Sequence, residues 1–160
     1  MIFAIHTRKI LNWNVTDHPD SEWVYRQVLT TTWDHPSPRY FVCDRDRKFG
    51  SSFTEDLKNR LKIDVLKTPF RAPKANAFVE RVIGSIRREC LDHFIIFGER
   101  SLRTVLRQYV HYFNNFRPHQ GIGQKIPMHA LSSVDLPRDG PVHSLPILGG
   151  LHHHYYRKAA

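Results

Sequence analysis

Apolar and polar positions alternate with a two-residue period at the start of the chain. Residues 10–15 set three apolar side chains against two asparagines, which is the pattern of a half-buried strand. Residues 2–5 are apolar and predict another strand just before it. The polar residues 6–9 between them predict a turn, so we expect the two strands to form a hairpin.

Four later windows repeat their apolar residues at helical spacing. The predicted helices cover residues 21–33, 52–61, 76–90 and 101–115. Asp20 or Ser21 can cap the first helix, Ser52 or Thr54 can open the second, Asn76 begins the third, and Ser101 caps the fourth. The short apolar runs 40–43 and 63–66 predict two more strands, the first of them buried. Strands therefore alternate with helices in the middle of the chain, which indicates an α/β domain with a mixed sheet.

The pattern changes after Pro118, because residues 126–160 are rich in Pro, Gly and His and show no periodicity. We expect a folded domain over residues 1–127 and an extended tail over residues 128–160. The tail contains the run His152-His153-His154. A metal site there is the weaker interpretation, because no further ligand pattern lies nearby.

Several classes of protein are excluded by the same patterns. No apolar run approaches the roughly 20 residues that a membrane-spanning helix needs. Met1 is followed directly by apolar residues without a basic region, so we expect no secretory leader. Cys43 and Cys90 form no short-spaced pair, which argues against a disulfide framework or a cysteine-based zinc site and suits a reducing compartment.

The net charge of the chain is +9, from 24 Lys and Arg against 15 Asp and Glu. Residues 39–125 hold 18 of the basic and 9 of the acidic residues, so all of the net charge lies in that stretch. A basic domain favours a polyanionic partner, with nucleic acid first and an anionic membrane surface second. A merely soluble basic protein is the alternative.

Two carboxylates have surroundings that suit chemistry on phosphates. Asp44 follows a predicted strand directly, and in α/β sheets ligands bind at the carboxyl ends of strands. Glu80 falls away from the apolar side of its predicted helix, among small and basic residues. A carboxylate among arginines can hold a divalent cation while the arginines hold phosphates. For Asp44 the alternative is a charged loop residue, and for Glu80 it is a solvated helix face.

The spacing of these two residues belongs to a longer pattern, since 35 residues separate Asp44 from Glu80. Four ordered segments carry it, namely residues 40–49, 68–81, 85–92 and 113–119. With them the chain resembles the DDE transposase and retroviral-type integrase superfamily, whose catalytic core has a ribonuclease H-like fold. Residues 113–119 are similar to the family's Tyr-Asn-x-x-Arg-Pro-His ending, with Phe113 in the Tyr place. The resemblance covers residues 1–127 and is closest to the integrase core of bacterial insertion-sequence transposases.

The resemblance implies specific roles. Asp44 matches the second catalytic carboxylate and Glu80 the third, and both would be ligands of a two-ion Mg²⁺ (or Mn²⁺) site that clamps the oxygens of a phosphodiester during in-line displacement. In the family, water nicks DNA and the freed 3′-hydroxyl attacks target DNA. The implied DNA-binding residues are Arg71, Lys74, Asn76, Arg81, Arg87 and Arg88. The implied setting is the bacterial cytoplasm beside the nucleoid, with a homo-oligomer or a full-length transposase as protein partner.

The sequence departs from the family at its start. The family's first carboxylate lies on the first, central strand of the fold, and no acidic residue precedes Asp17 here. We therefore expect an N-terminally truncated transposase: a decayed gene copy, a mis-called start or half of an interrupted element. Asp46 is a local stand-in candidate, although a spare loop charge is the preferred interpretation. The expected result is an incomplete metal site, little strand transfer and marginal stability.

Three functions compete on this basis. The first is a phosphoryl-transfer enzyme that acts on DNA with magnesium. The second is a non-catalytic DNA-binding remnant, which could modulate a full-length transposase. The third is an unrelated basic α/β domain.

Overall fold

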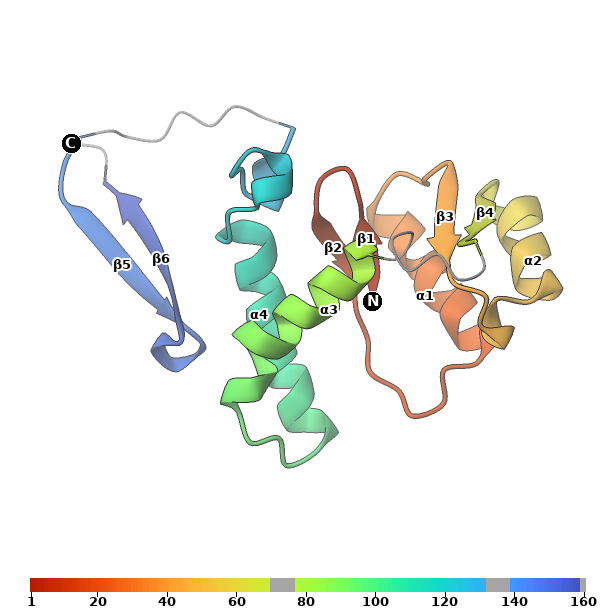
Figure 1. Ribbon diagram of the computed structural model, residues 1–160, viewed down its shortest axis with the longest axis horizontal. Coiled ribbons are helices and arrows are strands. Elements are labelled where there is room, and N and C mark those ends of the chain that lie inside the picture. Colours follow the sequence, from red (N-terminus) through yellow and green to blue (C-terminus); the bar gives the residue numbers. More distant parts are fainter. Residues whose placement is uncertain (70–76, 132–138, 159–160) are drawn as a thin grey trace. The chain divides into compact units, whose positions relative to one another are not determined.

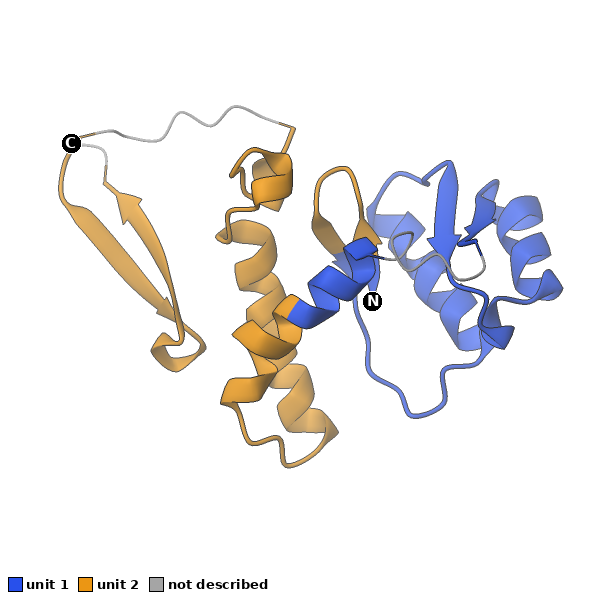
Figure 2. Ribbon diagram, in the orientation of Figure 1, with its two compact units in different colours: residues 1–2, 11–84 blue, residues 3–10, 85–160 orange. Residues whose placement is uncertain are grey.

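The computed structural model describes residues 1–69, 77–131 and 139–158 (Figure 1). The chain divides into two compact units (Figure 2), each of which is considered by itself. Unit 1 comprises residues 1–2 and 11–84, and unit 2 comprises residues 3–10 and 85–160. Within the described ranges, no helix is both long enough and apolar enough to cross a membrane.

Unit 1 contains two helices and two strands, followed by the start of a third helix. The elements are α1 (Ser21–Asp34), β3 (Tyr40–Cys43), α2 (Ser51–Leu61), β4 (Asp64–Lys67) and the first half of α3 (Ala77–Glu89). The carboxylate of Asp20 caps α1 and accepts a hydrogen bond from the backbone N–H of Trp23 at 2.7 Å. This N-cap and the bounds of β3 confirm the prediction.

The start of α2 differs from the prediction. The helix begins at Ser51 after an N-cap glycine, Gly50, and no side chain caps it. Thr54 lies inside the first turn, where its hydroxyl donates to the Gly50 carbonyl at 3.0 Å. A hydroxyl side chain near a helix start therefore marked the right region but not the capping position.

The core of unit 1 forms where the two helices meet the strands. Tyr25 and Val28 of α1 pack with Phe53 and Leu57 of α2 and with Ile63, which precedes β4. The rings of Phe41 and Phe49 extend this core around Phe53, with centroid distances of 5.8 Å (Phe41–Phe53), 5.3 Å (Phe49–Phe53) and 6.5 Å (Phe41–Phe49). Buried apolar area of this kind supplies most of the favourable free energy of a small domain.

Strands β3 and β4 pair in parallel, with Tyr40 opposite Asp64 and Cys43 opposite Lys67. The expectation that this strand is buried is wrong for alternate residues, since Tyr40 is 44% exposed and Val42 is 42% exposed. Side chains alternate across a strand, so one face of the sheet covers the core while the other faces solvent. In the described residues this sheet contains only these two strands.

Unit 2 is organised around a long helix. Its elements include the second half of α3, α4 (Glu99–Asn115), β5 (Val142–Ile147) and β6 (His152–Arg157). Helix α4 begins two residues before Ser101, which was predicted as its cap, because Gly98 is the N-cap residue. The Ser101 hydroxyl instead accepts a hydrogen bond from Phe97 N–H at 3.1 Å.

The segment predicted as an extended tail contains an antiparallel hairpin. β5 pairs with β6 so that Val142 lies opposite Arg157 and Ile147 lies opposite His152. Its side chains are mostly His, Tyr and Pro, which is why no apolar alternation marked it in the sequence. At the other end of the chain, β1 (Ile2–Ala4) and β2 (Lys9–Asn12) pair as expected.

The α/β class is confirmed by four α-helices and six short strands in the described residues. The strands pair as three separate two-stranded sheets in place of the single mixed sheet that was expected. The two cysteines are free and buried, as expected. Burial raises the pKa of each thiol to about 11.

A buried asparagine of α4 acts as a pin within unit 2. Asn114 is 8% exposed, and its side chain bonds both backbone groups of Ile10. Its Oδ1 accepts from Ile10 N–H and its Nδ2 donates to Ile10 C=O, each at 2.9 Å. Buried backbone groups need such partners, because leaving one unpaired costs about 1–3 kcal/mol.

We predict that Asn114→Leu lowers the free energy of unfolding by about 2–4 kcal/mol, because it leaves both groups of Ile10 without a partner. Urea denaturation measures the change. The matched control is Asn115→Leu on the next residue, whose side chain bonds only within α4, and it should cost less than about 1 kcal/mol. Equal losses in the two variants would contradict the pin.

Candidate functional site

Asp44 lies at the carboxyl end of β3, as the sequence predicts. The residues on either side of it are tied to the end of β4: Thr68 N–H donates to the Cys43 carbonyl at 2.9 Å, and Arg45 Nε donates to the Thr68 carbonyl at 3.0 Å. Asp44 itself is exposed, and its Oδ1 accepts from the backbone N–H of Asp46 at 3.1 Å. The carboxylate is therefore held in a tight turn at the edge where parallel strands place ligands.

Asp46 has a local structural role. Its Oδ1 accepts from Lys48 N–H at 3.1 Å, and its Oδ2 pairs with Lys48 Nζ at 2.9 Å. The backbone hydrogen bond from Lys48, followed by the side-chain bond from the same residue, holds the pKa of Asp46 below its usual value. A carboxylate engaged in this way caps the short 3₁₀ turn Arg47–Phe49, which supports the interpretation of Asp46 as a loop charge.

Glu80 lies in the first turn of α3 and is exposed. Val82 and Ser85 are buried and Glu89 is half-buried on the same helix. At about 100° per residue these three lie roughly 140–200° around the helix axis from Glu80. The carboxylate of Glu80 thus projects from the face opposite the packed one, and the expectation that it falls away from the apolar side is confirmed.

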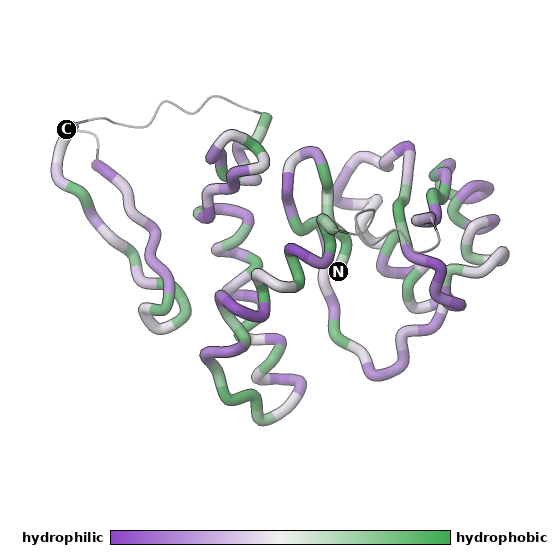
Figure 3. Tube along the Cα trace, viewed as in Figure 1, coloured by the Kyte–Doolittle hydropathy of each residue, from purple (hydrophilic) through white to green (hydrophobic). Residues whose placement is uncertain are grey.

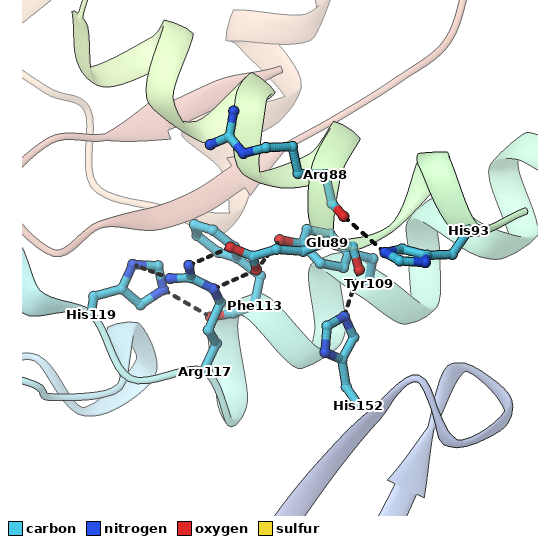
Figure 4. A network of polar contacts seen from close by, with 8 residues as sticks. All are labelled: Arg88, Glu89, His93, Tyr109, Phe113, Arg117, His119 and His152. Atoms are coloured by element: carbon cyan, nitrogen blue, oxygen red, sulfur yellow. Dashed lines mark hydrogen bonds and ion pairs between the residues drawn. The ribbon is translucent and has the colours of Figure 1, made fainter.

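Arg81, Arg87 and Arg88 are exposed on α3. Arg87 Nε lies 3.5 Å from Asp92 Oδ1, a surface ion pair of small energetic value. The side chain of Arg88 extends away from the polar contacts below it (Figure 4). The other three predicted DNA-binding residues, Arg71, Lys74 and Asn76, lie outside the described residues.

A metal centre is not formed by the residues that the structure describes. Asp44 and Glu80 offer hard oxygen donors, the type that Mg²⁺ and Mn²⁺ prefer. However, no group of three or more His, Cys, Asp or Glu gathers anywhere in the described ranges. The donor set present does not fit a complete two-ion site.

The second half of α3 is fixed to the end of α4 by an ion pair that the sequence analysis did not identify. Glu89 Oε1 accepts from Arg117 Nη2 at 2.6 Å, and Glu89 Oε2 accepts from Arg117 Nε at 2.7 Å (Figure 4). The hydroxyl of Tyr109, which is fully buried, donates to the same Oε2 at 2.9 Å. This two-pronged geometry is the strongest form of carboxylate–guanidinium pairing.

The protonation state of Glu89 follows from these partners. Burial alone would raise the pKa of Glu89, but the hydrogen bonds from Arg117 and Tyr109 outweigh it and hold that pKa below its usual value. Burial and the neighbouring carboxylate raise the pKa of Tyr109, so its hydroxyl stays protonated and can donate. Glu89 is therefore a structural anion.

His119 completes the network from the other side of Arg117. Its Nδ1 lies 3.3 Å from Arg117 Nη1 and its Nε2 lies 3.4 Å from the Phe113 carbonyl. Burial, followed by the charge of Arg117, lowers the pKa of His119 to about 4. A neutral ring with its proton on Nε2 accepts from Arg117 and donates to Phe113, which satisfies both nitrogens.

The signal for this network was present in the sequence as the ending motif 113–119. Asn114, Arg117 and His119 of that motif each make a buried or half-buried contact within unit 2. The motif suggested family membership but not its partners, because Glu89 precedes Arg117 by 28 residues. Such pairing over a long sequence separation has no local pattern.

Comparison with known proteins gives a family match over part of the chain and a similar fold. Residues 61–127 match the family described as integrase core domain, a segment that contains Glu80 and α3 but not Asp44. Among solved structures, the chain is similar to a chain of the simian T-cell lymphotropic virus intasome in complex with PP2A regulatory subunit B56 gamma. The identity is 16% and the TM-score 0.58, over 89% of this chain and 54% of that one.

The likeness to the intasome chain shows the fold alone, at this level of identity. The present chain spans about half the length of that chain. No curated protein sequence matches it.

We predict that His119 makes the chain less stable as the pH falls from about 6.5 to about 4. The unfolded chain binds a proton on this imidazole below about pH 6.5 and the folded chain only near pH 4, so stability is full above this window and lost within it. The loss approaches about 3 kcal/mol at the acid end, because each pH unit between the folded and unfolded pKa values contributes about 1.4 kcal/mol.

Urea denaturation of the wild type and of His119→Gln across this range tests the effect. The variant should show a flatter dependence of unfolding free energy on pH. His18→Gln, at a side chain that is 90% exposed, is the control and should follow the wild type. A variant curve parallel to that of the wild type would contradict the prediction.

A double-mutant cycle on Glu89→Gln and Arg117→Gln should reveal strong coupling. Each single change is expected to cost about 2–3 kcal/mol, because it leaves a half-buried charge without its partner. The double variant should cost less than the two together, with a coupling of about 1–3 kcal/mol. The control cycle on the exposed pair Glu22 and Arg26 should give a coupling energy of less than about 0.5 kcal/mol. Similar coupling energies for the two pairs would contradict the role of the Glu89–Arg117 pair as an anchor between α3 and the end of α4.

Proposed function

We propose that this chain is the DNA-binding part of a DDE-type transposase or integrase core whose own phosphoryl-transfer chemistry is impaired. The observation that carries the proposal is the match of residues 61–127 to the integrase core domain. That segment holds Glu80 and all six predicted DNA-binding residues. In this proposal, residues 1–127 belong to the integrase core and residues 128–160 form a separate C-terminal segment.

The basic face of α3 supplies the contact with DNA. Arg81 and Arg88 are exposed on the same helix as Glu80, and guanidinium groups bind phosphates through paired hydrogen bonds. The net charge of +9 adds attraction that does not depend on base sequence. The affinity should therefore fall steeply with salt.

The catalytic role of the carboxylates is limited by their number. The family's reaction uses metal ions that stabilise the attacking and leaving oxygens of a phosphodiester. Asp44 and Glu80 are proposed as the second and third carboxylates of that site, and no third His, Cys, Asp or Glu gathers with them in the described residues. Weak binding of Mg²⁺ or Mn²⁺ and little strand transfer are expected from two carboxylates alone.

The sheet of unit 1 is consistent with a ribonuclease H-like sheet that lacks its central strand. β3 and β4 form a parallel pair whose outer face exposes Tyr40, Val42 and Leu66. Parallel sheets normally have both faces covered and contain more strands than two. Apolar exposure of this kind supports a further element packed on the outer face, and the two-stranded pair has edges at which further strands could pair.

The alternative function is an active transposase core. An active core would need a third carboxylate close to Asp44 and Glu80, and the described residues contain no such cluster. The non-catalytic remnant, which acts on DNA or on a full-length transposase near the bacterial nucleoid, is therefore preferred. A homo-oligomer remains part of the proposal, because integrase cores act as multimers by resemblance.

Purified chain should bind duplex DNA with a salt-dependent affinity and show no strand transfer with Mg²⁺ or Mn²⁺. Asp44→Asn and Glu80→Gln should keep the affinity for DNA or raise it by up to about threefold, since each removes a negative charge that would repel the phosphate backbone of the DNA. Arg81→Gln combined with Arg88→Gln should weaken binding about tenfold and reduce the salt slope by about two. Fluorescence anisotropy between about 50 and 200 mM salt measures these values.

The matched control is Arg26→Gln combined with Arg60→Gln, which removes two exposed arginines of α1 and α2. It should leave the affinity within about twofold of the wild type. Strand transfer by the wild type that is lost in Asp44→Asn and Glu80→Gln would establish the enzyme instead. A chain without measurable DNA affinity would be an unrelated basic α/β domain.

A further inference from the structure

The β5–β6 hairpin of unit 2 is the largest described element without a part in the proposed function. The antiparallel register sorts its side chains into two faces. His152 and His154 of β6 lie on one face, and His153, Tyr155 and Arg157 lie on the other. The two faces have different surroundings.

The first face packs on α4. The His152 ring stacks on Tyr112, with centroids 4.3 Å apart and planes 9° apart, and the His154 ring stacks on Phe116 at 4.2 Å. His152 Nε2 also donates to the backbone carbonyl of Glu89 at 2.7 Å (Figure 4). The hairpin is thus anchored through this face, which leaves the other face uncovered within the unit.

The second face is aromatic, basic and free of acidic groups. Tyr155 is 66% exposed, and its ring centroid lies 5.9 Å from that of the exposed His153. Arg157 and Lys158 follow on the same strand end, with one Arg157 nitrogen donating to the Gly140 carbonyl. Residues 140–160 contain no Asp or Glu, and Asp139 is the nearest acidic residue along the chain. Figure 3 shows β6 coloured as hydrophilic along its length.

We propose that the outer face of the hairpin, formed by His153, Tyr155 and Arg157, binds a DNA strand with unpaired bases. The proposal rests on the DNA-binding function above and adds a second contact surface to it. An exposed aromatic side chain beside positive charge is the combination that holds single strands, since bases stack on the ring while cations bind the backbone. The absence of acidic residues from 140–160 gives the required charge complementarity.

The two rings form one aromatic platform. The ring centroids of His153 and Tyr155 lie 5.9 Å apart with 28° between the planes, which leaves too little room for a base between them. We therefore expect bases to stack on the solvent-exposed sides of this platform, as they do on single aromatic side chains.

Tyr155→Ala, Tyr155→Phe and His153→Ala test the surface. The probes are an oligothymidylate of about 20 nucleotides and a duplex of about the same length, with binding measured by fluorescence anisotropy at fixed salt. Tyr155→Ala should weaken binding of the single strand about tenfold and binding of the duplex less than about twofold, while Tyr155→Phe keeps the ring and the affinity. His153→Ala should weaken single-strand binding about threefold.

The control is Trp33→Ala, which removes an aromatic side chain of α1 that is 74% exposed, and it should bind as the wild type does. Single-strand affinity unchanged in Tyr155→Ala, or reduced equally for both probes, would overturn the proposal. A loss of self-association in Tyr155→Ala, without an effect on DNA, would overturn it in favour of a second copy as occupant. If the wild type binds neither probe, the proposed function fails as well. If DNA binding is weakened by Arg81→Gln combined with Arg88→Gln but not by the hairpin variants, the proposed function stands and only this inference is removed.

Discussion

The pairing of Glu89 with Arg117 is the interaction on which unit 2 depends. A carboxylate and a guanidinium that are each about a quarter exposed must satisfy one another, because solvent alone does not compensate their burial. The surrounding side chains are arranged to keep both charged: Tyr109 donates to the carboxylate and a neutral His119 accepts from the guanidinium. Replacing any one member therefore changes the electrostatic balance of the other three.

This anchor also explains how one helix can serve two environments. The packed face of α3 carries Val82, Ser85 and Glu89, and the opposite face carries Glu80 and the arginines. An amphipathic helix normally buries apolar residues alone. Here a half-buried carboxylate, Glu89, takes a place on the packed face because Arg117 and Tyr109 satisfy it.

The sequence predicted the elements whose signals are local. The run Tyr40–Cys43 and the Asp20 cap were correct because a β-prone run and an N-cap are decided by neighbouring residues. The start of α4 was missed because the glycine at its N-cap, Gly98, gives no side-chain signal and Ser101 resembled a cap. The hairpin was missed because its packed face uses His152 and His154, which do not count as apolar. Of the candidate site, the edge position of Asp44 and the outward face of Glu80 were predictable, whereas the Glu89 network joins residues too far apart in sequence.

The two buried thiols have a practical consequence for this chain. With a pKa of about 11, on the order of one thiol in ten thousand is ionised at neutral pH, and the thiolate is the reactive form. Cys43 and Cys90 are therefore nearly silent towards maleimide or disulfide reagents while the chain is folded. A cysteine placed at any exposed position would carry a spectroscopic label alone, so the native sequence already serves as the background for distance measurements between its two units.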